Sequence, residues 1–318
     1  MKKILVILGP TATGKTDVAL FLAGKFNGEL VACDSRQVYK QLDIGTGKLP
    51  NDSKTVVKGE KYWTINGVKI WMYDVVSTDR QYTVADYVKE ASKVINKVLN
   101  NRKLPIIVGG TGLYLKALLE GLDNLKLPLD KKLRGKLEKY TLSQLQDELQ
   151  KISPKRWEQL NNSDRNNSRR LLRSIELLSM NPYIGTKKNY PGLDKNFNLL
   201  KIGLTAPRNN LYEKVDSRVL RRLSEGMLGE AEDLFKKGLT IERMKSLGLE
   251  YGVLADFLVG KIKTRKDLTS ILKGKIHGYV RRQETWFKKE KQVLWFEITS
   301  KNVSLKIEKT VHKWYDTL

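Results

Sequence analysis

Short apolar runs alternate with helical patterns along much of the chain. Continuous apolar stretches at residues 4–8, 30–33 and 104–108 have the length of buried strands. Residues 16–25 and 84–100 instead place apolar side chains three and four positions apart, as an amphipathic helix does. This order is typical of strand–helix–strand units, and it predicts an α/β fold with a parallel sheet flanked by helices.

The pattern changes in residues 121–198. Apolar runs of strand length are missing there, and helical patterns such as that of residues 168–180 are joined by polar connections. The strand pattern returns at residues 199–204. We therefore predict a core domain of residues 1–120 and 199–318, interrupted by an all-helical insertion domain of residues 121–198.

Shorter signals complete the expected core. Asn66-Gly67 lies between two strand-like runs and predicts a hairpin turn. Residues 209–224 predict a helix on which Lys214, Arg218 and Arg221 share one side. We expect further helices at residues 228–237, 250–260 and 267–290, and a last strand at 293–296.

The first apolar run leads into a phosphate-loop motif. Every fixed position of the template G-x-x-x-x-G-K-[ST] is filled by the run Gly9, Pro10, Thr11, Ala12, Thr13, Gly14, Lys15 and Thr16. The glycines let backbone N–H groups point at an anion, Lys15 adds a positive charge, and the Thr16 hydroxyl can bind Mg²⁺. The motif predicts a site for a di- or triphosphate without identifying which one.

Asp34 follows the second predicted strand. Residues just beyond the carboxyl ends of parallel strands line the ligand crevice, so this carboxylate is expected near the bound phosphate. It could act in proton transfer, hold Mg²⁺ as a Walker B aspartate does, or cap a helix. The third strand runs into Gly109-Gly110 with no acidic residue at its end, which disfavours NTP hydrolysis.

Composition narrows the partners. Lys and Arg total 59 against 35 Asp and Glu, a formal net charge of +24. This excess is compatible with a solvated surface but favours a polyanionic partner such as a nucleic acid. Cys33 is the sole cysteine and only two histidines are present, which excludes an internal disulfide and disfavours a transition-metal centre. We expect Mg²⁺, held largely by phosphate, as the only metal.

No apolar stretch approaches the ~18 residues that a membrane-spanning helix needs. The first predicted strand begins within three residues of Met1, which leaves no room for a secretory signal. We therefore expect a soluble cytoplasmic protein with no membrane partner, and we expect a monomer.

Four stretches, in this order and spacing, carry a resemblance to a known family. They are the phosphate loop, residues 34–39 (Asp-Ser-Arg-Gln-Val-Tyr) with 43–46, residues 109–114 with 118–121, and residues 279–286. Together they resemble the tRNA dimethylallyltransferases. The resemblance implies a kinase-like parallel sheet with a helical insertion and transfer of a dimethylallyl group from dimethylallyl diphosphate to tRNA. The acceptor would be N6 of adenosine 37, just 3′ of the anticodon, and pyrophosphate would leave without ATP hydrolysis.

The resemblance also implies roles for individual residues. Asp34 would accept the N6 proton, Arg218 would help neutralise the departing pyrophosphate, and Lys15 and Thr16 would complete the catalytic set. Thr16 would also contact Mg²⁺, and the phosphate loop would hold the diphosphate. The positions that match RNA-binding residues of the family are Asp34, Ser35, Arg36, Gln37, Thr111, Arg134, Arg169, Arg170, Arg173, Tyr279, Arg281, Arg282 and Gln283.

The chain departs from the family pattern at two points. Ile276-His277 stands where the family usually has Thr-Arg, and Ile70-Trp71 where it has paired histidines.

Three other functions are alternatives: an ATP-dependent kinase of a small molecule or nucleotide, an RNA-binding protein with an inactive phosphate loop, and a prenyltransferase of free adenine nucleotides. The basic insertion disfavours small substrates, and the intact phosphate loop, Asp34 and Arg218 disfavour an inactive scaffold.

Overall fold

The computed structural model describes residues 2–50, 53–122, 125, 127, 130–180, 193 and 197–317. The chain divides into two compact units, one formed by Met1–Glu120 with Leu193–Leu318 and the other by Gly121–Gly192. The first unit contains the sheet, and the described part of the second consists of helices.

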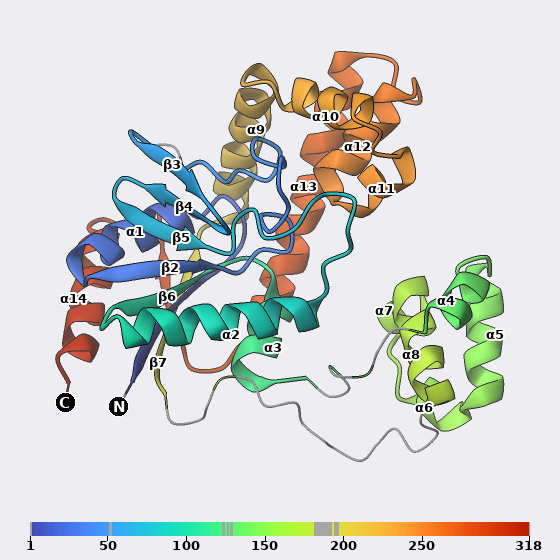
Figure 1. Cartoon of the computed structure of the whole chain (residues 1–318), viewed down its shortest axis with the longest axis horizontal. Helices are drawn as coiled ribbons and strands as arrows, with labels where there is room; N and C mark the ends of the chain where they lie inside the picture. The colour runs from blue at the N-terminus through green and yellow to red at the C-terminus, as the bar shows by residue number, and fades with distance from the viewer. Residues whose placement is uncertain are drawn as a thin grey trace. The chain divides into compact units, whose positions relative to one another are not determined.

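A mixed sheet of eight strands forms the centre of the first unit (Figure 1), in the order β3-β4-β5-β2-β6-β1-β7-β8. From β5 to β8, neighbouring strands are parallel, as predicted. At the other edge, β4 runs antiparallel to both β3 and β5. The strands are β1 (Lys3–Leu8), β2 (Gly28–Ala32), β3 (Val56–Gly59), β4 (Tyr62–Ile65), β5 (Val68–Trp71), β6 (Leu104–Gly109), β7 (Asn198–Thr205) and β8 (Val293–Glu297).

The antiparallel edge arises from the hairpin predicted at Asn66-Gly67. These two residues join β4 to β5 with φ of 50° and 80°, the positive values that a tight two-residue hairpin turn requires. The hairpin places β5 beside β2 and leaves β3 as the outer strand. The turn is therefore confirmed, and it explains why the sheet is mixed at this edge.

Helices cover both faces of the sheet. α1 (Lys15–Lys25) connects β1 to β2, and α2 (Val84–Asn100) leads back to β6. Because right-handed crossovers that run in opposite directions lie on opposite faces, α1 and α2 cover different faces. α3 (Gly112–Glu120) packs on α2, and α14 (Val303–Tyr315) packs on β7 and β8. A capping box starts α2, where the Thr83 and Asp86 side chains cap each other's backbone N–H groups.

Five helices follow β7 and share one apolar cluster with the segment after β2. They are α9 (Arg208–Ser224), α10 (Met227–Lys236), α11 (Ile241–Ser246), α12 (Leu249–Leu258) and α13 (Arg265–Phe287). Leu211, Val215 and Val219 of α9 and Val280 of α13 are buried in this cluster. The sequence did not predict α11, because six residues are too few to establish a helical period. The packing fixes α9 and α13 against each other beside the phosphate loop.

The second unit has a core of its own, in which Leu145 and Leu149 meet Leu171 and Ile175. Its helices are α4 (Lys131–Leu137), α5 (Leu142–Ile152), α6 (Pro154–Glu158), α7 (Asn162–Arg165) and α8 (Ser168–Met180). Helix α8 has the predicted bounds and buries its aliphatic side in this core. Residues 123–124, 126, 128–129, 181–192 and 194–196 of the predicted insertion lie outside the described residues.

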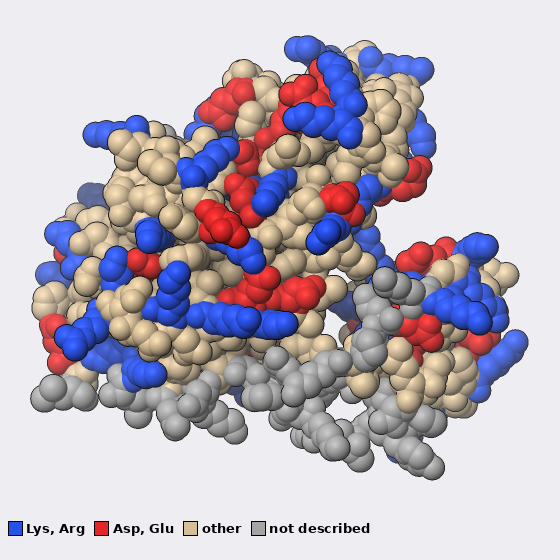
Figure 2. Space-filling model, viewed as in Figure 1, with Lys and Arg blue, Asp and Glu red and all other residues tan. Residues whose placement is uncertain are grey.

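Basic side chains are distributed over the surface. Figure 2 shows Lys and Arg spread over the coloured part of the visible face, interspersed with Asp and Glu. The net charge of +24 is therefore not the property of one tail. Among the helices of the described ranges, none combines the length and apolarity needed to cross a bilayer.

Candidate active site

A cavity of about 680 Å³ opens at the carboxyl ends of the central strands. It is lined by Ala32 at the end of β2, by Asp34 two residues later and by Val108 to Gly110 at and just after the end of β6, and the phosphate loop after β1 forms one side. Helices α9 and α13 contribute further side chains. The cavity therefore lies where an open parallel sheet binds its ligands, as the strand pattern predicted.

The phosphate loop has the conformation that its glycines permit. Gly9 has φ of 138°, and a Cβ there would lie 2.3 Å from the Leu204 carbonyl oxygen. Gly14 has φ of 74° and precedes α1, whose first N–H groups receive no side-chain cap. The Lys15 ammonium donates to the Pro10 carbonyl at 2.6 Å, which closes the loop on itself. The positive end of α1 and the Lys15 charge thus face one anion site.

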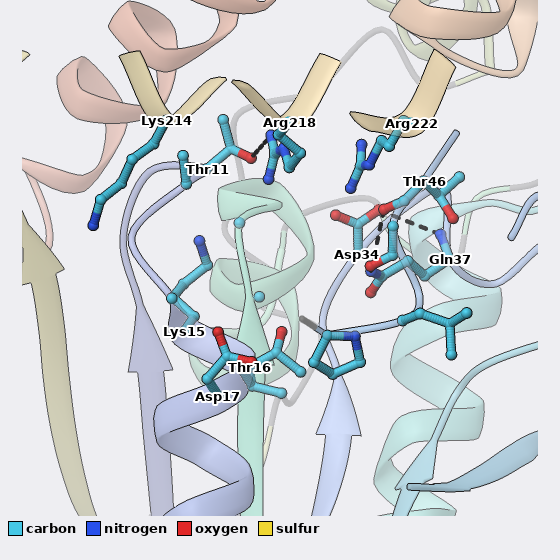
Figure 3. Close-up of a pocket in the computed structure, with 18 of the residues that line it drawn as sticks. Thr11, Lys15, Thr16, Asp17, Asp34, Gln37, Thr46, Lys214, Arg218 and Arg222 are labelled. Carbon is cyan, nitrogen blue, oxygen red and sulfur yellow. Dashed lines mark hydrogen bonds between the residues drawn. The ribbon is translucent and has the colours of Figure 1, made fainter. Parts of the chain in front are cut away.

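Arg218 extends from α9 to this loop. Its Nη2 donates to the Thr11 hydroxyl at 2.6 Å, and the guanidinium group and Lys15 line the same cavity (Figure 3). Burial and the nearby Arg218 charge lower the pKa of Lys15 to about 7. Burial and the Arg222 charge lower the pKa of Arg218 to about 9. Cations that repel one another in a low-dielectric pocket are a strong site for a multivalent anion.

Asp34 lies across the cavity from Lys15 in the view of Figure 3. Its Oδ1 accepts the backbone N–H of Arg36 at 2.8 Å and of Gln37 at 3.3 Å, which fixes the turn after β2. The residue thus caps a local turn and also lines the cavity. Capping accounts for one carboxylate oxygen, so this geometry is compatible with a chemical role for the other.

Gln283 of α13 ties the loop after β6 to the phosphate loop. Its Oε1 accepts the Thr11 backbone N–H at 2.8 Å, and its Nε2 donates to the Gly110 carbonyl at 2.9 Å. A Cβ on Gly110 would lie 2.4 Å from that amide nitrogen, so the close approach requires glycine. Tyr279, one turn earlier, lines the cavity, and burial together with the Asp34 charge raises the pKa of its hydroxyl.

Many of the predicted site residues meet at this cavity, and others do not. Pro10 and Thr13 are buried within the phosphate loop and do not line the cavity; the Thr13 hydroxyl donates to the Pro10 carbonyl at 2.9 Å. Thr111 accepts the Ser35 backbone N–H at 3.1 Å and so fixes the turn that carries Asp34. The predicted residues that line the cavity are Thr11, Ala12, Gly14, Lys15, Thr16, Asp34, Gln37, Arg218, Tyr279 and Gln283.

Three predicted RNA-binding arginines of the first unit lie outside the cavity lining. Arg36 donates to the Ser246 carbonyl at 3.1 Å and packs near Gly248. Arg281 donates to the Tyr212 hydroxyl at 2.9 Å, and Arg282 is exposed on α13 near Tyr279. Their predicted contact with RNA stays a prediction.

The two departures from the family pattern have structural partners. Ile70 and Ile276 are buried in the core. The Trp71 indole N–H donates to Glu29 Oε2 at 2.7 Å. The His277 Nε2 atom lies 2.8 Å from Asp216 Oδ1, and the imidazole ring stacks on the Tyr212 ring.

The predicted arginines of the insertion differ in their surroundings. Arg134 binds the carboxylate of Glu176 with two hydrogen bonds, of 2.7 and 2.8 Å, and Arg173 binds it at 3.2 Å. Glu176 is fully buried, so these two arginines also neutralise a charge in the core of the second unit. Arg170 pairs with Asp164 on the surface, and Arg169 is exposed at the start of α8. Arg134 and Arg173 therefore have a structural role in the second unit, and their predicted contact with RNA stays a prediction.

Several cavity residues were not predicted as site residues. Gly47 and Tyr73 belong to a segment whose sequence carried little signal, and Thr46 ends the stretch 43–46, which carried the resemblance without a site role for Thr46. Arg222 lies on α9 about one turn after Arg218, and the i, i+4 spacing could have revealed it. Lys214 and Arg221, which the helical spacing did place with Arg218, also line the cavity.

Comparisons with known proteins agree with this site. The family model described as IPP transferase matches residues 37–290, and that described as isopentenyl transferase matches residues 2–69. A tRNA dimethylallyltransferase 2 of Treponema denticola is 37% identical over 292 residues, which cover 90% of this chain and 91% of that protein. A tRNA dimethylallyltransferase of Pelotomaculum thermopropionicum is 36% identical over 93% of this chain and 90% of its own length.

Solved structures give the same result. The full-length tRNA isopentenylpyrophosphate transferase of Bacillus halodurans matches with a TM-score of 0.69 and 29% identity, over 99% of this chain and 97% of that one. A eukaryotic dimethylallyltransferase acting on tRNA matches with a TM-score of 0.79 over 99% of this chain and 80% of that one. At 24% identity, this second likeness is one of fold.

Proposed function

The chain belongs to the IPP transferase family, and we propose that it transfers a dimethylallyl group from dimethylallyl diphosphate to tRNA. The acceptor is N6 of adenosine 37, just 3′ of the anticodon, and pyrophosphate is the second product. The chain is thus a prenyltransferase that modifies tRNA.

One observation carries this proposal: the cavity joins a diphosphate site to a carboxylate. Lys15, Arg218 and the start of α1 form the cationic side, and Asp34 lines the other. A kinase would need the same phosphate site, but β6 ends in Gly109 and Gly110 without the acidic residue that often holds a nucleotide-bound metal.

The reaction forms a bond between N6 of the adenine and C1 of the dimethylallyl group, while the bond from C1 to the diphosphate oxygen breaks. The aromatic amine is a weak nucleophile, and in our proposal Asp34 orients it and accepts the proton that it loses. The leaving diphosphate keeps the electron pair of the broken bond, and Lys15 and Arg218 stabilise its charge. Repulsion among these cations in the free protein means that the ligand relieves an unfavourable interaction as it binds.

A divalent cation accompanies the diphosphate, and we propose Mg²⁺. The Thr16 hydroxyl and the carboxylates of Asp17 and Asp34 line the cavity, and oxygen donors suit this ion. In the described part of the chain no three His, Cys, Asp or Glu residues form a metal cluster. The diphosphate and water must therefore supply much of the coordination, and the bound ion would neutralise charge on the leaving group.

Binding of tRNA requires that the target adenine enter the cavity and that basic side chains contact the RNA phosphates. An adenine stacked in the anticodon loop cannot enter a cavity floored by strand ends, so the base must be flipped out to react. Arginine side chains of both units, such as Arg169 and Arg282, are exposed and available to phosphates. We propose that the second unit binds the anticodon stem-loop and that the protein acts as a monomer in the cytoplasm, where it meets tRNA.

Pyrophosphate release tests this function. The protein is incubated with unmodified tRNA, dimethylallyl diphosphate and MgCl₂, and phosphate is measured after inorganic pyrophosphatase is added. We expect release only when both substrates are present, in proportion to the tRNA supplied. Release with AMP in place of tRNA would point to a prenyltransferase of free nucleotides, and phosphate transfer from ATP to a small acceptor would replace the proposal by a kinase.

A further inference from the structure

Helix α9 presents another arginine, which is buried, to the cavity about one turn after Arg218. Arg222 lines the cavity and is only 8% exposed. Its Nη1 donates to the Gly45 carbonyl at 3.0 Å, which fixes the direction of the side chain. Among the described residues, neither arginine forms an ion pair within 4.0 Å. Burial lowers the pKa of Arg222, and the Glu250 charge opposes this shift only in part. A buried guanidinium group that no carboxylate contacts is costly unless a ligand supplies the missing charge.

The neighbouring loop is shaped around this side chain. A Cβ added to Gly47 would lie 1.6 Å from the Arg222 Nη2 and 2.6 Å from its Cζ. Even alanine at position 47 is therefore incompatible with the observed place of the guanidinium group. Gly47 also has φ of 63°, a conformation that favours glycine. The close approach shows that the absence of a side chain at 47 is what lets Arg222 occupy the cavity wall.

The loop itself is held from several sides, so it cannot simply yield. The Glu230 carboxylate accepts the backbone N–H groups of Asp43, Ile44 and Gly45 at 2.8, 2.8 and 3.0 Å. Gln37, another cavity residue, donates to the Thr46 and Gly47 carbonyls at 3.4 and 3.2 Å. The position of Arg222 is thus set before any ligand arrives, which is a property of a binding group rather than of a mobile surface arginine.

We propose that Arg222 is a second diphosphate-binding arginine, which acts together with Arg218 on the two phosphate groups of one ligand. The inference deepens the function proposed above and rests on it for the identity of the diphosphate.

The spacing of the two arginines favours one shared ligand. Side chains four residues apart on a helix have Cβ atoms about 5–6 Å apart, within the reach of two guanidinium groups on one diphosphate. Arg222 is also the neighbour that lowers the pKa of Arg218 most after burial itself, which shows that the two charges interact. A single multivalent anion relieves this repulsion better than two separate monoanions do. A phosphate of the RNA backbone is the competing ligand, and the experiment below separates it.

Binding of inorganic pyrophosphate in MgCl₂, measured by isothermal titration calorimetry on the full chain, tests the assignment without requiring transfer activity. We expect Arg222→Met, which keeps an unbranched side chain but removes the charge, to weaken binding by about 10- to 100-fold. Arg222→Lys should show a smaller loss, because it keeps a charge but not the planar fork. Arg208→Met is the matched control: Arg208 lies on the same helix, exposed and paired with Glu284, and we expect less than about a twofold change.

A double-mutant cycle with Gly47→Ala adds a steric test that does not depend on Arg222→Met alone. In the wild-type background this substitution should displace the arginine and weaken pyrophosphate binding about as much as Arg222→Met does. In the Arg222→Met background it should leave the affinity within about twofold. Additive effects of the two changes would contradict the idea that Gly47 acts through Arg222.

Two results would overturn the assignment. One is folded Arg222→Met protein, checked by circular dichroism, that binds pyrophosphate within twofold of wild type. The other is unchanged pyrophosphate binding with at least tenfold weaker tRNA binding, which would assign Arg222 to the RNA backbone. Failure of the wild-type protein to transfer a prenyl group would refute the proposed function, while a loss of pyrophosphate binding in Arg222→Met would still establish the anion-binding role.

Discussion

Substitution of Asp34 by Asn separates the chemical role of this residue from its structural one. Asparagine keeps the Oδ1 acceptor that receives the Arg36 and Gln37 N–H groups at 2.8 and 3.3 Å. A neutral acceptor weakens each bond by about 1 kcal/mol or less, so the folded state should survive. The substitution replaces Oδ2 by an amide nitrogen, which cannot accept a proton.

The expected kinetic effect is much larger than the structural one. Removal of a general base typically lowers the rate by about 10² to 10⁴, equivalent to about 3–5 kcal/mol in the activation barrier. We therefore expect Asp34→Asn to lower the single-turnover rate of prenyl transfer by that factor and to leave pyrophosphate affinity nearly unchanged. Glu213→Gln is the matched control, because Glu213 is another carboxylate that lines the cavity, on α9, and has no proposed role in proton transfer or metal binding; we expect less than a tenfold loss.

A magnesium titration decides between the two roles left open for this carboxylate. The transfer rate of Asp34→Asn is measured at increasing MgCl₂ with saturating substrates. If Asp34 is the base, the rate stays low at every concentration. Recovery to near the wild-type rate at high MgCl₂ would refute the reasoning and would make Asp34 a metal ligand.

Lys15 and Gln283 of the first unit and Glu176 of the second can each be tested by a single substitution. Lys15 has a pKa of about 7, and a bound diphosphate favours its charged form, so binding should take up a proton. Pyrophosphate affinity, measured by calorimetry, should therefore fall about fivefold between pH 7 and 8 relative to the affinity of Lys15→Arg. An equal pH dependence of the two proteins would contradict this. Gln283→Leu removes one buried and one part-buried hydrogen bond and should lower the free energy of unfolding, measured in urea, by about 2–4 kcal/mol. A loss below about 1 kcal/mol would be inconsistent with the observed bonds. Glu176→Gln leaves Arg134 and Arg173 near an uncharged partner, so proteolysis within residues 121–192 should accelerate. The affinity for tRNA should fall while the affinity for pyrophosphate is unchanged. A parallel loss of both affinities would refute an effect confined to the second unit.

Local signals predicted much of the catalytic unit. The phosphate loop, the hairpin at Asn66-Gly67 and the helix that carries Arg218 depend on residues within a few positions of one another, and the structure has each of them. The antiparallel edge of the sheet could not be predicted with equal ease, because strand neighbours depend on contacts distant in sequence. The short helix α11 was missed for a different reason, since its six residues cannot display a period.

Contacts distant in sequence also explain what was missed at the site. Arg222 is one more basic residue on a basic helix until its guanidinium group is seen against Gly47, 175 positions earlier. Glu176 is an ordinary charged residue of α8 until its burial shows that Arg134 and Arg173 must neutralise it. In both cases burial changes the meaning of a charge, and a sequence pattern does not report burial of a single polar side chain.

Transfer of a dimethylallyl group to N6 of one adenosine in tRNA can be observed directly. Unmodified tRNA with adenosine at position 37 is incubated with the protein, dimethylallyl diphosphate and MgCl₂ in the absence of ATP, and its nuclease fragments are analysed by mass spectrometry. We predict one added dimethylallyl group, on the fragment that contains adenosine 37, and none when that position carries guanosine. No added mass, a strict requirement for ATP, or a prenyl group on a different nucleotide would contradict the account.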